Sequence, residues 1–442
     1  MTDWTQARAA DLGRGIESGQ IDPVALTEAF LAAIGSAAQS EDIYARLTPE
    51  RALAEARDAR ERAKLCLRRG PLDGVPVSWK DLFDTAGVET EAGTALLEGR
   101  VPAEDAAVLQ NASGAGLVCL GKTHLSELAF SGLGLNPITA TPPNVHDPSW
   151  VPGGSSSGAA ASVAFGLAAA GIGSDTGGSV RIPSAWNDLV GLKATHGLLP
   201  NDGSVPLASA FDTVGPLCRT VEDAGLLLSA LGATSAPDLR GSALAGARLA
   251  VLETVAFDDI RDAPARAFET AVQRLSAAGA EVSRIAAPEV AEALALSGVL
   301  FATEAYGTWV HVIEATPDKM FPPILERFRG GKDFDAPTYV AGWRKLMDLR
   351  ARWADRVAGF DAVLTPSAPI LPPDRHRLLS DANYYMTENL LALRNTRIGN
   401  LMGLCALSLP TGEPACGLQV LAPAFAEARL LRLGVAMEPV LT

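Results

Sequence analysis

Cysteine and histidine are scarce in this sequence, and neither is arranged for metal binding. The chain has 442 residues, of which 5 are Cys and 5 are His. No two cysteines form a CxxC pair, their number is odd, and no HExxH motif occurs. We therefore expect no metal ion and no disulfide framework, but buried free thiols in a reducing compartment.

Long apolar runs and basic segments are missing as well. The most apolar stretch, residues 158–173, is rich in Ala and Gly and too short to span a bilayer. The first residues have neither the basic nor the apolar region of a secretory signal. Lys and Arg number 37 against 51 Asp and Glu, which gives a net charge of −14. We therefore expect a soluble cytoplasmic protein that binds neither nucleic acid directly nor a membrane.

What the sequence does contain is typical of a large α/β protein. Residues of the AVILMFWYC set make up 48% of the chain, enough for a substantial core. The first 70 residues read as helices, one of them running from Thr48 to about Arg69. Beyond them the pattern predicts strands at 75–79, 116–120, 170–174, 248–252, 360–365, 407–410 and 418–421, and helices at 123–130, 158–170, 263–279 and 337–358. This alternation favours a layered α/β fold without internal repeats.

One motif fits the phosphate-binding P-loop. Residues 116–123 read Gly-Leu-Val-Cys-Leu-Gly-Lys-Thr and match GxxxxGK[ST]. A P-loop requires a bare, turning loop whose amides face phosphate, whereas the four variable positions here are strand residues. Backbone that is already paired in a sheet cannot also bind phosphate, so we set this interpretation aside.

A second motif fits the GxSxG nucleophile elbow. Residues 154–158 read Gly-Ser-Ser-Ser-Gly, with Ser156 at the centre. An elbow follows a strand, and residues 148–153 do not read as one. A Ser-His-Asp esterase would also need His311 or His376, neither of which lies in a supporting local pattern. This hypothesis remains an alternative.

A third set of residues has a chemical logic of its own. Lys80 ends a short apolar run, a Gly/Ser loop occupies 153–158, and Asp-Thr-Gly-Gly-Ser follows another predicted strand at 175–179. A serine hydroxyl is a weak nucleophile and needs a base. A buried lysine can be that base because desolvation lowers its pKa, and a second serine can carry the proton. The two glycines before Ser179 leave amides that can face a developing oxyanion.

These residues resemble the amidase signature family. The similarity lies in Gly-Val-Pro-Val-Ser-Trp-Lys-Asp at 74–81, Pro-Gly-Gly-Ser-Ser-Ser-Gly at 152–158 and Gly-Ser-Asp-Thr-Gly-Gly-Ser-Val-Arg at 173–181. It is dense over about 70–235 and continues in shorter fragments to residue 412. The order and spacing of several motifs together make the resemblance specific.

The resemblance implies a role for each matching position. The nucleophile, the proton shuttle and the base are Ser179, Ser155 and Lys80. Four backbone amides form the oxyanion hole, those of Thr176, Gly177, Gly178 and Ser179. Three further positions hold the set together: Ser156, Asp175 and Arg181. Ser131 matches a loop position that can contact the substrate, and a cis peptide bond is expected between Gly154 and Ser155.

Two positions depart from the family pattern. Ser157 stands where Gly is usual, and His124 stands where Asn is common. Neither change removes a catalytic group. Ser157 restricts the loop backbone slightly, and His124 alters the wall of the expected pocket.

The resemblance also implies a fold and an activity. We expect one domain over residues 1–442, with a mixed sheet covered by helices on both faces, in which the signature core (70–235) lies between N-terminal helices (1–70) and a C-terminal part (236–442) that adds sheet and pocket. The expected activity is that of an amidase, which cleaves a small carboxylic amide to acid plus amine or ammonia through a Ser179 acyl-enzyme. No cofactor is implied, and a homodimer is left open.

Two questions remain open at this stage. The same family includes the glutaminase-type A subunit of the tRNA-dependent amidotransferases, which works with a partner. The substrate is also unspecified, although residues 125–150, 300–345 and 370–400 are expected to line its pocket. Those segments contain aromatic and basic candidates for substrate contact: Trp309, Phe321, Trp343, Tyr384, Tyr385, Arg394 and Arg397.

Overall fold

One large mixed sheet crosses the molecule. The computed structural model describes residues 4–233 and 236–441, so the expected boundaries at residues 1, 235 and 442 lie outside the described residues. The strands are β1 (Tyr44–Leu47), β2 (Pro76–Lys80), β3 (Val118–Thr123), β4 (Ala170–Ser174), β5 (Val190–Lys193), β6 (Val214–Cys218), β7 (Arg248–Leu252), β8 (Glu281–Ile285), β9 (Ala362–Pro366), β10 (Cys405–Pro410) and β11 (Gly417–Ala422).

These strands form an 11-stranded sheet in the order β1-β3-β2-β4-β6-β5-β10-β11-β9-β7-β8. Pairing is parallel where β2 meets β3 and β4, and again where β7 meets β8 and β9. The remaining neighbours are antiparallel. The predicted single domain with a mixed sheet is therefore confirmed.

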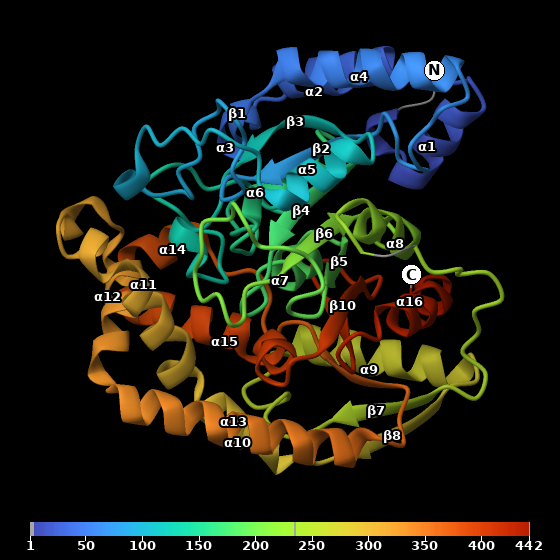
Figure 1. The fold of residues 1–442 in the computed structure, drawn as a ribbon. Coiled ribbons are helices and arrows are strands. Elements are labelled where there is room, and N and C mark those ends of the chain that lie inside the picture. Colours follow the sequence, from blue (N-terminus) through green and yellow to red (C-terminus); the bar gives the residue numbers. More distant parts are fainter. Residues whose placement is uncertain (1–3, 234–235, 442) are drawn as a thin grey trace.

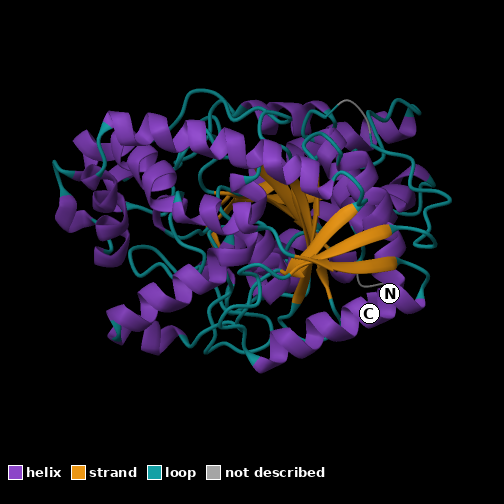
Figure 2. Cartoon of the chain, turned by 90° about the horizontal axis from the view of Figure 1, so that it is seen from below, coloured by secondary structure: helices purple, strands orange, loops and turns teal. Residues whose placement is uncertain are grey.

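Helices surround this sheet, as the two views show (Figure 1, Figure 2). They are α1 (Ala9–Glu17), α2 (Pro23–Ser36), α3 (Ser40–Ile43), α4 (Pro49–Lys64), α5 (Ala107–Gly114), α6 (Ser157–Ala164), α7 (Arg181–Trp186), α8 (Val221–Ala230), α9 (Asp262–Ala277), α10 (Pro288–Ala295), α11 (Thr303–Ile313), α12 (Pro322–Arg329), α13 (Ala336–Val357), α14 (Arg375–Ser380), α15 (Ala382–Leu401) and α16 (Glu427–Leu441). Among the residues described, no helix is both long and apolar enough to cross a membrane.

Three predicted helices end early or do not form. Helix α4 ends at Lys64 rather than near Arg69, because Cys66 takes a left-handed conformation with φ 57°. Helix α6 ends at Ala164, because Gly166, two residues further on, has a left-handed φ of 72°. The predicted helix at 123–130 is wrong, since β3 extends to Thr123 and a short 3-10 turn (Glu127–Ala129) follows. Four strands were not predicted, namely β1, β5, β6 and β8.

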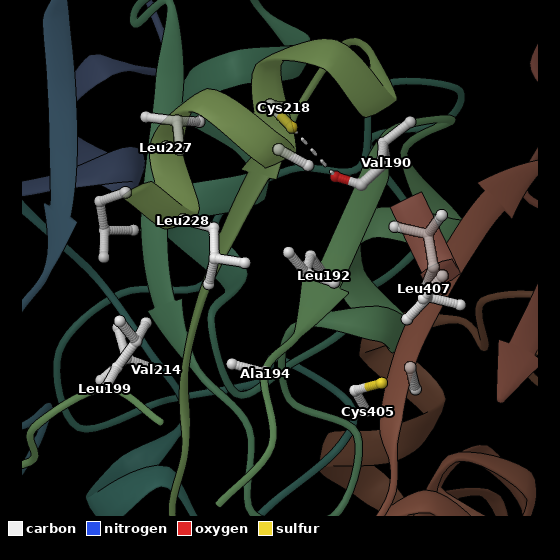
Figure 3. Close-up of a cluster of buried hydrophobic side chains, with 14 of the residues drawn as sticks. Val190, Leu192, Ala194, Leu199, Val214, Cys218, Leu227, Leu228, Cys405 and Leu407 are labelled. Carbon is white, nitrogen blue, oxygen red and sulfur yellow. Dashed lines mark hydrogen bonds between the residues drawn. The ribbon is translucent and has the colours of Figure 1, made fainter. Parts of the chain in front are cut away.

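The largest cluster of buried apolar residues lies between the helices and the sheet, and Figure 3 shows where α8 packs over β5, β6 and β10. Leu227 and Leu228 of α8 lie above the strand side chains, and the Cys218 thiol donates to the Val190 carbonyl at 3.8 Å. Cys119, Cys218, Cys405 and Cys416 are buried free thiols, as expected. Cys66 is exposed, which corrects the expectation that all five thiols are buried.

Small residues let α6 approach the sheet closely. A Cβ on Gly158 would lie 2.6 Å from the Ile43 carbonyl oxygen, and a Cβ on Gly171 would lie 2.6 Å from the Ala159 carbonyl oxygen. Real side chains do not come so near to backbone, so both positions require glycine. This packing fixes the loop before α6, which carries Ser155 and Ser156, against the end of β4.

Candidate active site

Lys80 lies at the carboxyl end of β2 and is completely buried. Its Nζ is 2.7 Å from Ser155 Oγ and 2.8 Å from Ser174 Oγ. Burial lowers the pKa of Lys80 to about 7, against an opposing pull from the carboxylates of Asp175 and Asp212. Desolvation disfavours the charged ammonium, so a substantial fraction of this amine is neutral near pH 7.

Ser174 is a part of this cluster that sequence reasoning missed. It ends β4, which lies parallel to β2, so the two strand ends bring Ser174 and Lys80 to one edge of the sheet. Its position directly before the Asp175 turn could have indicated a site residue. Ser174 was instead interpreted as part of the predicted strand at 170–174. Ser174 gives the lysine a second hydroxyl partner, which fixes its orientation.

The loop before α6 places the other serines. The peptide bond between Gly154 and Ser155 is cis, as the resemblance implied. The N–H of Ser156 donates to the Ser179 carbonyl at 3.1 Å, which holds this loop beside the Asp-Thr-Gly-Gly-Ser turn. Ser155 is fully buried, whereas Ser179 lines a pocket. Within the described chain the Ser179 hydroxyl forms no hydrogen bond, so it is available to a ligand.

The turn before Ser179 presents several backbone amides. Those of Thr176, Gly177 and Ser179 donate to no acceptor within residues 4–233 and 236–441. The Gly178 amide differs, because it donates to Asp175 Oδ1 at 2.8 Å. Of the four amides expected to form an oxyanion hole, three are therefore unbonded within the described residues and that of Gly178 is paired.

Asp175 and Arg181 hold the turn from beneath, and both are completely buried. The guanidinium donates to both oxygens of Asp175 through Nε at 3.0 Å and Nη2 at 2.8 Å. It also reaches across to α15 and β11, where it bonds to Thr396, Asn400 and Gln419. Despite burial, Arg181 keeps the pKa of the Asp175 carboxyl well below its usual range.

Ser156 is not an elbow nucleophile, which corrects the esterase alternative. It is fully buried, and its hydroxyl donates to the Ser174 carbonyl at 3.2 Å. That hypothesis needs His311 or His376, but both lie exposed on helices, and neither bonds to Ser156 within the described chain. The role that the structure gives Ser156 is to tie the α6 loop to β4.

Most of the motif at 116–123 is a strand, as its apolar residues predicted, since β3 spans Val118–Thr123. Lys122 is buried in β3, and its Nζ donates to Asp81 Oδ1 and Thr90 Oγ1 at 2.9 Å each. Both its charge and its backbone are thus already paired. Among the described residues, no group of His, Cys, Asp and Glu is arranged to hold a metal ion.

A pocket of about 160 Å³ opens at Ser179. Its walls are mostly apolar, and a π-helical turn (Gly298–Ala302) forms one of them; the larger side chains are Phe130, Leu207, Phe301, Leu390 and Leu393. Ser131 lines the pocket, where it accepts from Tyr385 Oη at 3.0 Å and donates to Asn389 at 3.1 Å. Such a site suits a small, partly apolar substrate.

The aromatic candidates lie elsewhere than expected. None of Trp309, Phe321, Trp343, Tyr384 and Tyr385 is among the residues that line this pocket. Trp343 stacks on Phe211, and Tyr385 reaches the site indirectly through Ser131. Of the two arginines, Arg397 lines the pocket and Arg394 does not.

Comparison with known proteins identifies the family. The family model described as Amidase matches residues 25–431. 2-Amino-5-chloromuconic acid deaminase of Comamonas testosteroni is 38% identical over 382 residues, covering 84% of this chain and 82% of that protein. The A subunit of glutamyl-tRNA(Gln) amidotransferase from Mycobacteroides abscessus is 32% identical, covering 99% and 98%. A crystal structure of an amidase matches with a TM-score of 0.88 at 29% identity, covering 99% and 100%.

The chain therefore belongs to the amidase signature family, as its motifs predicted. It is an amidohydrolase that acts on amide C–N bonds.

Proposed function

We propose that Ser179 is the nucleophile of this amidase, with Ser155 as proton shuttle and Lys80 as base. The observation that carries the proposal is the buried contact of Lys80 Nζ with Ser155 Oγ at 2.7 Å. A neutral amine has one lone pair and can accept the Ser155 proton while it donates to Ser174. The amine is neutral in the required pH range because burial lowers its pKa to about 7.

The reaction then runs through a covalent acyl-enzyme. Ser179 Oγ gives its proton to Ser155, which passes its own proton to Lys80, and the serine oxygen bonds to the amide carbon. The relay returns the proton to the amide nitrogen, the C–N bond breaks, and the amine leaves. Water next loses a proton to the same relay and attacks the acyl carbon, which releases the acid and restores the Ser179 hydroxyl.

The free amides of Thr176, Gly177 and Ser179 support an oxyanion hole. They belong to a turn held by the buried Asp175–Arg181 pair, so their directions are set before the substrate binds. Preorganised donors stabilise charge that develops in the transition state. Ser131 belongs to the proposed substrate contacts because it lines the same pocket.

Replacement of the nucleophile tests this assignment directly. We expect Ser179→Ala to abolish amide hydrolysis and labelling by a fluorophosphonate, with wild-type circular dichroism. Ser156→Ala is the matched control, because its hydroxyl is bonded to backbone away from the pocket, and it should keep the label. Near-wild-type turnover by Ser179→Ala would show that the nucleophile is wrongly assigned.

A second candidate function is that of the glutaminase-type partner in a tRNA-dependent amidotransferase. The nearly complete match to one such protein at 32% identity favours it. We propose the stand-alone cytoplasmic amidase, acting on small amides alone or as a homodimer, because it needs no partner to complete the site described above. Purified chain should then release ammonia or amine from simple amides unaided. Activity that requires a second, tRNA-binding protein would instead support the amidotransferase.

The Comamonas relative widens the substrate panel for this test. It is named for the deamination of an amino-substituted unsaturated acid. An unsaturated amino acid therefore belongs beside aliphatic and aryl amides in the first screen.

A further inference from the structure

Two arginines line the pocket of Ser179 and have no hydrogen-bond or ion-pair partner among the described residues. Arg327 belongs to α12 and Arg397 to α15, which come from distant parts of the sequence. Neither donates a hydrogen bond or forms an ion pair within residues 4–233 and 236–441. The Nε of Arg327 is buried and unbonded, and its guanidinium lies 4.5 Å from the centre of the Phe130 ring.

This situation contrasts with the other arginine of the site. Arg181 is fully buried, and its guanidinium is satisfied by Asp175, a backbone carbonyl and two side-chain amides. Buried charges in proteins are normally paired, because an unpaired one loses its hydration without compensation. Arg327 and Arg397 are half-buried and line one cavity without an acceptor among the described residues, which indicates that an anion completes the site.

The distribution of charges around the pocket also favours a bound anion. No Asp or Glu is among its described lining residues, although the whole chain has a net charge of −14. Burial and the neighbouring Arg327 together lower the pKa of Arg397 to about 9. A carboxylate bound between the two guanidiniums would relieve their mutual repulsion, whereas a substrate ammonium group would be repelled by both.

The Ser179 pocket adjoins a second cavity, and the two share three lining residues. This second cavity has a volume of about 220 Å³ and is lined by Asp212 and by Ser174, which contacts Lys80. The leaving nitrogen must face the relay that protonates it, so we place it toward Ser174 and the acyl part in the Ser179 pocket with the two arginines. Arg397 Nε lies 3.9 Å from the position of a Cβ on Gly177, within the turn that offers the oxyanion donors.

Resting on the proposed function, we propose that Arg327 and Arg397 bind a carboxylate on the acyl part of the substrate. The substrate class is then the monoamides of dicarboxylic acids without a cationic group. Guanidinium donors match a carboxylate in pairs, and Phe130 and Leu393 pack against the carbon chain between the two ends. Glutamine, whose ammonium group would face two cations, is a poor substrate under this assignment.

Three amides of matched length test the assignment through ammonia release. Glutaramate carries the carboxylate, 5-methylhexanamide replaces it with an isopropyl group, and glutamine adds an ammonium group to the same chain. We expect kcat/KM for glutaramate to exceed each of the others by about tenfold or more. Malonamate, succinamate and adipamate locate the best chain length. Equal or better turnover of the neutral amide would overturn the proposal and leave the nucleophile assignment standing.

Substitutions assign the preference to these two side chains. Arg327→Met and Arg397→Met should each reduce the preference for glutaramate over the neutral amide by about 10- to 100-fold. The Arg→Lys variants should keep part of it. Arg394→Gln is the matched control, because Arg394 lies on the same helix but donates to the Ala256 carbonyl, outside the pocket. An undiminished preference in both Met variants would overturn the proposal.

Binding of glutarate separates this proposal from the catalytic one. Measured by calorimetry, wild-type protein should bind glutarate at least about tenfold more tightly than either Met variant whose circular dichroism is unchanged. This holds even if no amide is hydrolysed, a result that would contradict the proposed function alone. Equal glutarate affinity in wild type and both variants would overturn the carboxylate site.

Discussion

The proposed base makes a prediction about stability that does not depend on activity. Lys80 is completely buried, and burial lowers its pKa in the folded protein to about 7, whereas an unfolded lysine titrates near 10.4. Between these values the unfolded chain holds one proton more than the native protein at this position. The free energy of unfolding therefore rises with pH across this window.

The size of the effect follows from the two pKa values. One pH unit of differential protonation corresponds to about 1.4 kcal/mol. From about pH 7 to pH 9 the native lysine is mostly neutral and the unfolded one charged, so Lys80 contributes about 2 kcal/mol of pH-dependent stability. Lys80→Met keeps the volume of the side chain but removes this proton. The stability of wild type relative to Lys80→Met should therefore increase by about 2 kcal/mol over that range.

Urea unfolding of both proteins at the two pH values measures this difference. The other titrating groups are shared, so their contributions largely cancel. Lys64→Met is the control, because Lys64 lies on the exposed end of α4, where its ammonium forms a surface ion pair with Glu61. If the stability difference between wild type and Lys80→Met did not change with pH, the lysine would be protonated in the folded state. The base assignment would then be refuted.

Two further predictions concern the same cluster. The kcat/KM for amide hydrolysis should fall about tenfold per pH unit below pH 7 and level off above it, because protonated Lys80 cannot accept a proton; a profile that stays flat to about pH 5 would contradict a lysine base. Asp175→Ala should lower the free energy of unfolding by about 3–5 kcal/mol, since it leaves the Arg181 guanidinium buried with part of its charge unpaired. Urea denaturation measures the loss, and a change below about 1 kcal/mol would show that the ion pair is dispensable.

The strands that were predicted correctly from the sequence are apolar and end at turn residues. Strand β4 was located residue for residue, because Gly and Ser positions bound its apolar run. Strand β6 was missed because it contains Gly215 and Pro216, and proline is unusual within a sheet. It nevertheless lies centrally, where Pro216 pairs with Ile172 of β4. Strand β8 was missed because it forms an edge whose residues are largely exposed.

The residues of the site also divide into those whose position could be predicted from the sequence and those whose position could not. Lys80 ends β2 and the Ser179 turn follows β4, and the carboxyl ends of parallel neighbours share an edge, so their proximity could be predicted. Ser174 was overlooked because it belongs to the strand itself. The approach of Arg327 to Arg397 had no sequence signal, since 69 positions separate residues 327 and 397 and the packing of α12 and α15 around the pocket sets their relation. Sequence motifs thus indicated the candidate catalytic cluster, whereas the lining of the pocket depended on tertiary structure.

The Asp175–Arg181 pair affects both the turn that carries Ser179 and the proposed base, Lys80. One carboxylate fixes the amides of Gly178 and Val180 and so shapes the turn that carries Ser179. The same negative charge opposes the lowered pKa of Lys80, since it favours the ammonium form. The Arg181 guanidinium, bonded to both carboxylate oxygens, offsets that charge. The desolvation of Lys80 can therefore outweigh the attraction of Asp175. A turn that is held by a charged residue thus remains compatible with a neutral amine on the neighbouring strand.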